Sequence, residues 1–203
     1  MPMEIKICGL KRVEDTLMVN KFEKIKYVGF VFANTSRKIT IEKALEIKKN
    51  LRPDIKTVGV FAGQPMEEII EIMEKADLDV CQLHSGETNE DCGLINKTVW
   101  KSISVKDKKS AEIAESYTNA DGFVLDTFKK NQWGGTGETF DWSAVEDFSK
   151  KHFTILAGGI NSANVNDAIE KVSPNIIDLS SSVEVGGFKN YDKIKEFMES
   201  LKY

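Results

Sequence analysis

Two side chains in the sequence are of types that transfer protons, the thiol of Cys8 and the carboxylate of Asp126. Polar and apolar residues alternate over 4–7, which predicts a short strand that ends at Cys8. Asp126 ends a second predicted strand, the apolar run 122–125. In parallel α/β folds ligands bind at the carboxyl-terminal ends of the strands, so both groups stand where chemistry is expected. Taken alone, Cys8 fits a buried structural cysteine better, and Asp126 fits a cap or an ion-pair partner.

Glycines and serines at two other strand ends predict a phosphate site. Gly158 and Gly159 follow the seventh predicted strand, and Ser181 and Ser182 follow the eighth. Barrels often bind phosphate at these two ends, because glycine lets backbone N–H groups approach the ligand and a serine hydroxyl also donates. The alternative for the glycine pair is a tight turn without a ligand.

Two further strand ends carry groups suited to a polar ligand. Arg37 lies in a polar loop after the second predicted strand, and its planar guanidinium suits a carboxylate. A solvated loop arginine is the alternative. His84 ends the fourth predicted strand and is expected to contact the substrate, the alternative being a satisfied polar residue under a loop. The irregular stretch 127–141 contains Gly134-Gly135-Thr136-Gly137, which predicts either a segment that closes over the ligand or a plain flexible loop.

These residues share one face only if the strands are parallel and adjacent. Eight apolar runs alternate with eight helical segments along the chain, and parallel strands require such crossover helices. Eight units of this kind predict a closed (β/α)₈ TIM barrel of the phosphate-binding type, with residues 1–203 as a single domain. The predicted strands are 4–8, 27–32, 57–61, 79–84, 99–105, 122–126, 154–156 and 176–179.

An open, doubly wound sheet is the competing layout. It is disfavoured because no G-x-G-x-x-G motif follows the first strand and no strand is obviously an edge. Side-chain caps mark where three of the helices begin, since a short polar side chain can accept a backbone hydrogen bond from the first turn. The expected caps are Thr40, Asp141 and Ser162.

Composition excludes several classes of function. The net charge of −4 gives no basic face for nucleic acid, and no apolar run approaches the length of a membrane span. The three cysteines, Cys8, Cys81 and Cys92, are an odd number and widely spaced, which argues against a disulfide framework or a zinc site and for a reducing cytoplasm. The amino-terminal residues do not resemble a signal peptide, and two histidines are too few for a His-rich metal centre.

Short motifs in order along the chain resemble those of the phosphoribosylanthranilate isomerase family of tryptophan biosynthesis. The specific combination is Lys6-Ile7-Cys8-Gly9-Leu10 near the start with Gly134-Gly135-Thr136-Gly137 and Phe140-Asp141-Trp142. Ser182 stands where the family usually has glycine. The other matching pieces, which extend the resemblance over nearly the whole chain, are Gly29-Phe30-Val31-Phe32, Val58-Gly59-Val60-Phe61, Gln82-Leu83-His84, Leu125-Asp126, Leu156-Ala157-Gly158-Gly159-Ile160 and Asp178-Leu179-Ser180-Ser181.

The resemblance implies an Amadori rearrangement of N-(5′-phosphoribosyl)anthranilate, a small-molecule substrate. Cys8 matches the general base that takes the proton from C2′, and Asp126 matches the general acid that protonates the furanose ring oxygen. Arg37 matches the residue that holds the anthranilate carboxylate. The resemblance implies no cofactor or metal, because the aromatic amine of the substrate forms the iminium that makes C2′–H acidic. A monomer or a homodimer is expected.

Two other functions remain as alternatives. The related isomerase of histidine biosynthesis performs the same type of rearrangement, but it typically uses two carboxylates in two similar half-barrels. Cys8 and the lack of an internal half-repeat argue against it. A non-catalytic barrel that binds phosphate ligands is hard to reconcile with both Cys8 and Asp126. Replacing Cys8 by alanine discriminates, because an enzyme would keep binding and lose turnover.

Overall fold

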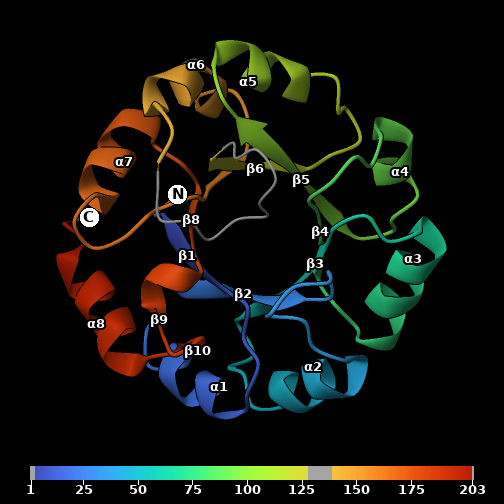
Figure 1. Cartoon of the computed structure of the whole chain (residues 1–203), viewed down its shortest axis with the longest axis vertical. Helices are drawn as coiled ribbons and strands as arrows, with labels where there is room; N and C mark the ends of the chain where they lie inside the picture. Colours follow the sequence, from blue (N-terminus) through green and yellow to red (C-terminus); the bar gives the residue numbers. More distant parts are fainter. Residues whose placement is uncertain (1–2, 128–138, 203) are drawn as a thin grey trace.

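Eight parallel strands form a closed barrel in the computed structural model, which describes residues 3–127 and 139–202 (Figure 1). Strand β1 pairs with β2 on one side and with β8 on the other, so the sheet closes on itself. The predicted (β/α)₈ barrel is therefore confirmed. The strands are β1 (Glu4–Cys8), β2 (Ile25–Val31), β3 (Lys56–Phe61), β4 (Val80–Leu83), β5 (Thr98–Val105), β6 (Gly122–Thr127), β7 (Thr154–Leu156) and β8 (Ile176–Leu179).

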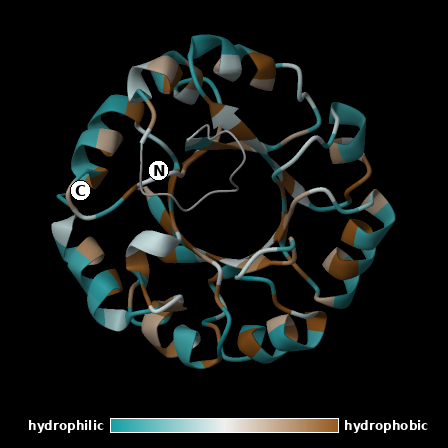
Figure 2. Ribbon diagram, viewed as in Figure 1, coloured by the Kyte–Doolittle hydropathy of each residue, from teal (hydrophilic) through white to brown (hydrophobic). Residues whose placement is uncertain are grey.

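Helices surround the barrel on the outside, and their apolar sides face the strands (Figure 2). They are α1 (Glu14–Val19), α2 (Ile41–Lys48), α3 (Met66–Lys75), α4 (Asn89–Gly93), α5 (Lys108–Ala114), α6 (Glu146–Ser149), α7 (Val165–Val172) and α8 (Tyr191–Ser200). A 3₁₀ turn, η1 (Trp142–Val145), precedes α6. Within the described ranges, no helix combines the length and the apolar character that crossing a bilayer requires.

The alternation of side chains along each strand creates two separate apolar cores. On β1, Ile5 and Ile7 point outward into the layer between sheet and helices, and both are fully buried. The opposite face of the strands fills the barrel interior, where Tyr27 and Trp100 pack with ring centroids 5.1 Å apart. Cys8 belongs to this inner cluster. The inner core therefore forms a packed floor beneath the carboxyl-terminal end of the barrel.

Two of the three predicted helix caps are confirmed. The side chains of Thr40 and Asp141 each accept a hydrogen bond from a backbone N–H in the first turn of the following helix. The prediction for Ser162 is wrong, because α7 begins after Asn164 and no side chain caps it. The turn before α7 is instead held by the Asn164 side chain, which accepts a 2.9 Å hydrogen bond from the backbone N–H of Asn161.

A small hairpin between β8 and α8 interrupts the predicted alternation. It consists of β9 (Glu184–Val185) and β10 (Phe188–Lys189), and it follows a 3₁₀ turn, η2 (Ser181–Val183). The hairpin lies near α1 and α8 (Figure 1). Lys11 and Arg12, in the segment after Cys8, lie over the Phe188 ring at 4.5 and 4.2 Å from its centroid. The hairpin is thereby fixed against the loop that follows β1.

Candidate active site

A cavity of about 560 Å³ lies at the carboxyl-terminal ends of the strands. Its size is ordinary for a small-molecule site. The barrel brings together every substrate-contact and proton-transfer residue expected from the sequence, and all line this cavity: Cys8, Arg37, His84, Asp126, Gly158, Gly159, Ser181 and Ser182. The predicted closing segment Gly134-Gly135-Thr136-Gly137 falls outside the described residues.

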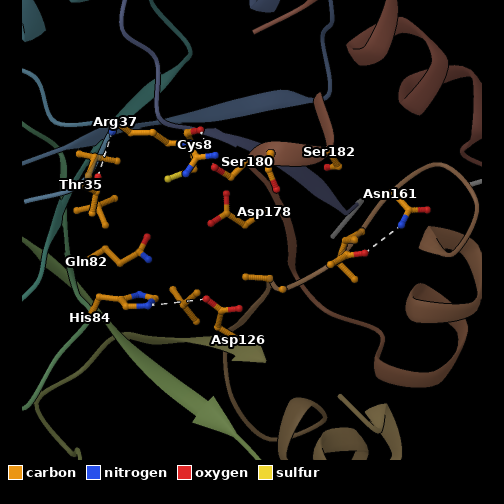
Figure 3. A pocket seen from close by; sticks show the side chains of 18 of the residues that line it. Cys8, Thr35, Arg37, Gln82, His84, Asp126, Asn161, Asp178, Ser180 and Ser182 are labelled. Atoms are coloured by element: carbon orange, nitrogen blue, oxygen red, sulfur yellow. Dashed lines mark hydrogen bonds and ion pairs between the residues drawn. The ribbon is translucent and has the colours of Figure 1, made fainter. Parts of the chain in front are cut away.

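The cavity has two polar ends, and Cys8 and Asp126 lie between them. Figure 3 shows Arg37 at one end and Ser182 and Asn161 at the other. Cys8 and Asp126 lie on opposite sides of the space between these ends. An elongated ligand with an anionic group at each end would therefore place its middle between the thiol and the carboxyl group.

Cys8 is the last residue of β1 and faces the barrel interior with 9% of its surface exposed. It pairs in register with Gly29 of β2, and a Cβ atom at Gly29 would lie 2.7 Å from the Cys8 Sγ. Glycine at that position is what leaves room for the thiol. Burial raises the pKa of Cys8, Lys6 lowers it and Asp178 raises it, with a net upward shift.

Asp126 lies near the end of β6 and is likewise buried. Its Oδ1 accepts a 2.7 Å hydrogen bond from the backbone N–H of Thr127. Burial raises the pKa of Asp126 above its ordinary value, although the Thr127 N–H and Lys6 lower it in part. The shift favours the carboxylic acid, which is the form that can donate a proton.

Gly158 covers Asp126 from the β7 side. Its φ of +77° is in the left-handed region, and a Cβ atom there would lie 2.6 Å from the Asp126 Oδ1. Both the backbone conformation and the close approach require glycine. The sequence explained this glycine by phosphate binding or by a tight turn, and the structure adds a role in closing the wall around Asp126.

His84 follows β4, and its Nε2 lies 3.8 Å from the Asp126 Oδ2. Burial lowers the pKa of His84, and the charges of Lys6 and Lys101 lower it further. The imidazole is therefore neutral at neutral pH, and its approach to Asp126 is not an ion pair. A neutral imidazole beside Asp126 can either donate a hydrogen bond to a ligand or accept one from it.

Arg37 is held by a carboxylate that sequence analysis missed. Its Nε and Nη2 donate to the two oxygens of Glu184 at 2.9 and 2.7 Å, and Lys189 donates to the same carboxylate at 2.7 Å. Burial alone would raise the pKa of Glu184, but Arg37 and Lys189 lower it to about 2. Arg37 is therefore not a solvated loop arginine. The Nε–Nη2 edge meets Glu184, which leaves the other guanidinium edge for a ligand.

The predicted phosphate end of the cavity is built from backbone and small side chains. Gly158 and Gly159 both have positive φ, and within the described ranges their N–H groups donate to no other protein group. The Asn161 and Asn164 side chains hold the Gly159 carbonyl at 3.1 and 3.0 Å. This fixed turn, with Ser181 and Ser182 beside it, offers hydrogen-bond donors to an anion.

Several cavity residues were not singled out from the sequence, among them Asp178 and Gln82. Both sit on barrel strands, and both side chains hydrogen bond to the buried Lys6. A polar residue at an inward position of an apolar strand was the available signal, because Asp178 interrupts the run 176–179.

Residues 5–200 match the model of one protein family, described as N-(5′-phosphoribosyl)anthranilate (PRA) isomerase. The chain belongs to this family. It is 43% identical over 201 residues to the N-(5′-phosphoribosyl)anthranilate isomerase of Thermoanaerobacter sp. (strain X514), with 98% of each chain covered. The crystal structure of the phosphoribosyl anthranilate isomerase from Thermotoga maritima matches with a TM-score of 0.89 at 34% identity, covering 98% of both chains.

A second solved structure of a phosphoribosyl anthranilate isomerase is a complex with reduced 1-(o-carboxyphenylamino)-1-deoxyribulose 5-phosphate. It matches this chain with a TM-score of 0.85 at 33% identity, covering 98% of this chain and 97% of the other. The ligand in that structure carries a carboxylate at one end and a phosphate at the other. The cavity described here likewise has a separate polar group at each end (Figure 3).

Proposed function

We propose that Cys8 and Asp126 are the base and the acid with which this isomerase rearranges N-(5′-phosphoribosyl)anthranilate to 1-(2-carboxyphenylamino)-1-deoxyribulose 5-phosphate. The observation that carries the proposal is their placement on opposite sides of one cavity, between two sites for anions. Arg37 binds the carboxylate of the anthranilate. The backbone of Gly158 and Gly159, with Ser181 and Ser182, binds the phosphate.

The reaction begins with opening of the furanose ring. Asp126 donates its proton to the ring oxygen while the bond between C1′ and that oxygen breaks. The electron pair of the broken bond stays on the oxygen. The lone pair of the anthranilate nitrogen then forms an iminium with C1′. Burial favours the protonated form of Asp126 that this step needs. His84 lies beside the acid and contacts the sugar oxygens there.

Proton transfer from C2′ follows. The Cys8 thiolate takes this proton, the C–H electron pair forms a C1′–C2′ double bond, and the iminium nitrogen becomes a neutral amine. The resulting enol becomes the ketone when a proton moves from its hydroxyl oxygen to C1′, and proton exchange with solvent then returns Cys8 to the thiolate and Asp126 to the acid. The atoms of substrate and product are the same, so the protein needs only to move protons and hold the two anionic ends.

The active form of the enzyme has an ionised thiol and a protonated carboxyl group. At neutral pH each of these is the minority form, because the ordinary pKa values of cysteine and aspartate are about 8.5 and 3.9. The upward pKa shift of Asp126 raises the active fraction, and the upward shift of Cys8 lowers it. Between the two pKa values the active fraction is constant, because gaining thiolate and losing carboxylic acid cancel as pH rises.

The proposal is tested by turnover and by labelling. The purified protein should convert freshly generated N-(5′-phosphoribosyl)anthranilate, followed by loss of anthranilate-type fluorescence. Iodoacetamide should inactivate it through Cys8, because Cys81 and Cys92 have at most 1% of their surface exposed. A product analogue should protect. Inactivation through Cys81, with Cys8 unlabelled, would exclude this mechanism.

Three further properties belong to the same proposal. We infer that residues 1–203 are a single domain, which is supported by the pairing of β1 with β8. We infer a reducing, cytoplasmic setting, supported by three cysteines that are all free and buried. The enzyme is a monomer or a homodimer, which size-exclusion chromatography with light scattering would distinguish.

A further inference from the structure

A charged cluster lies inside the barrel directly below the cavity. Lys6 precedes Cys8 by two residues on β1, so both side chains point inward on the same face of the strand. Lys6 is fully buried, and its Nζ donates to the Asp178 Oδ2 at 2.7 Å and to the Gln82 Oε1 at 2.9 Å. Burying a lysine ammonium costs free energy, and an apolar side chain of similar volume would fill the same space without that cost.

The hydrogen bonds in this cluster leave one lysine donor for the thiol. An ammonium group has three N–H donors, and Asp178 and Gln82 use two. The remaining N–H is available to the Cys8 sulfur on the same face of β1, and the Lys6 charge lowers the pKa of that thiol. In the part of the chain that the structure describes, the Asp178 Oδ1 makes no hydrogen bond, although it is buried at the cavity. The cluster is thus oriented toward the cavity and is not fully satisfied within itself.

We propose that Lys6 is the positioning residue that makes Cys8 a base, its buried ammonium stabilising the thiolate by its positive charge on the same inward face of β1. Asp178 holds the ammonium in place and moderates its effect. This inference rests on the proposed role of Cys8. It goes further by naming the group that offsets the cost of ionising a thiol in a buried site.

The charges around Cys8 support the assignment. From β1, the loop after β2, and β10, three cations face it: Lys6, Arg37 and Lys189. Two carboxylates offset them, since Asp178 on β8 pairs with Lys6 and Glu184 on β9 is shared by Arg37 and Lys189.

With all five of these groups ionised, one positive charge is left over beside the thiol; burial shifts the pKa values of Asp178 and Lys189 toward neutrality, and losing both charges together leaves the same excess. The two groups across the cavity do not cancel it, because Asp126 is biased toward its neutral acid and His84 toward its neutral ring. A thiolate at Cys8 balances the excess charge. Lys6 stays charged, because Asp178 and Cys8 outweigh the effect of burial and raise the pKa of Lys6 above its ordinary value.

A second buried lysine in the barrel provides a matched control. Lys101 on β5 has 2% of its surface exposed, and its Nζ donates to Glu87 at 2.8 Å and to the Ser85 carbonyl at 2.5 Å. It resembles Lys6 in burial and in pairing with a carboxylate. The charges that mainly shift the pKa of Cys8 are those of Lys6, Asp178 and Lys189, and Lys101 is not among them.

The test measures the ionisation of Cys8 without requiring turnover. The rate of iodoacetamide alkylation at Cys8, read by peptide mass spectrometry, is followed against pH in the unliganded enzyme and three variants. In Lys6→Met the midpoint should rise by at least ~1 pH unit, the effect of losing an adjacent opposite charge. At a fixed pH below the midpoint, alkylation should then be ~10-fold slower. In Asp178→Asn the midpoint should fall, and in Lys101→Met it should stay unchanged.

The opposite signs separate electrostatics from damage to the fold, which would not shift the midpoint up in one variant and down in the other. A wild-type midpoint in folded Lys6→Met overturns the proposal. If near-UV circular dichroism shows that Lys6→Met is unfolded, Asp178→Asn decides, and a midpoint that is unchanged or higher there also overturns it. The catalytic role of Cys8 is judged separately by the kcat of Cys8→Ser, so a failure of the base assignment is distinguishable from a failure of the Lys6 assignment.

Discussion

At the scale of single residues, burial raises the pKa of both groups that are proposed to transfer protons, with opposite consequences for their roles. It favours the protonated form of Asp126, which suits an acid, and the protonated form of Cys8, which does not suit a base. The sequence predicted both residues because each ends an apolar strand. It could not predict Gly29, whose role depends on strand register, nor Lys6, whose partners lie 76 and 172 positions away.

Gly158→Ala should lower both stability and turnover. A side chain at a φ of +77° costs about 1–2 kcal/mol, and the new Cβ would press on the Asp126 carboxyl. Gly186→Ala is the control, since Gly186 has a φ of +58° in the β9–β10 turn and a Cβ there would meet nothing within 4 Å. Urea unfolding should show similar losses of stability in both variants, whereas kcat should fall in Gly158→Ala alone. Equal kcat values would show that Gly158 does not shape the acid site.

At the scale of elements, the hairpin of β9 and β10 holds the Arg37 end of the cavity. It brings Glu184 and Lys189 to Arg37, and it packs against the loop that follows β1. The eight barrel strands were predictable because long apolar runs mark strands that are buried on both faces. The hairpin strands have two residues each and partly exposed side chains, so no periodicity marks them.

Arg37→Ala should raise KM much more than it lowers kcat. Its proposed ligand partner is a carboxylate that substrate and product both carry, so the interaction should be uniform binding. Glu184→Gln should raise KM by a smaller factor, because the guanidinium stays but loses its bidentate support. Steady-state kinetics would check both. Losses of kcat without a change in KM would show that Arg37 serves the chemistry itself.

The same carboxylate makes part of the stability depend on pH. The pKa of Glu184 is about 2 in the folded protein against an ordinary value of 4.5. Because this pKa is lowered, its stabilising contribution is complete above pH 4.5 and is lost as pH falls toward 2. Denaturant unfolding in this range should therefore show a shallower pH dependence for Glu184→Gln than for the wild type. Parallel curves would mean that Arg37 and Lys189 do not stabilise the Glu184 carboxylate.

At the scale of the whole molecule, the barrel closes where the first strand meets the last. The register of β1 on β8 aligns Lys6 with Asp178, so the buried ion pair spans the closing seam. The closed barrel was predictable from eight alternating units. The seam was not, because an isolated aspartate in a strand does not reveal which strand carries its partner.

Removing one member of that pair should destabilise the barrel by about 3–5 kcal/mol, because the other charge is left buried and uncompensated. Lys6→Met and Asp178→Asn should each show a loss in urea unfolding. The double variant should lose less than the sum of the two, as expected for residues in direct contact. Additive losses would show that the two side chains are not coupled across the seam.

The central claim is that Cys8 and Asp126 act together as base and acid across one cavity. The most direct measurement is kcat for Cys8→Ser, Asp126→Asn and the double variant, with freshly generated N-(5′-phosphoribosyl)anthranilate as substrate. Each single change should lower kcat by at least ~10², with KM altered little. The double variant should lose less than the product of the single losses, because both groups serve one proton path. Full kcat in Cys8→Ser would contradict the account, and Cys8 would then be only a packed thiol of the inner core.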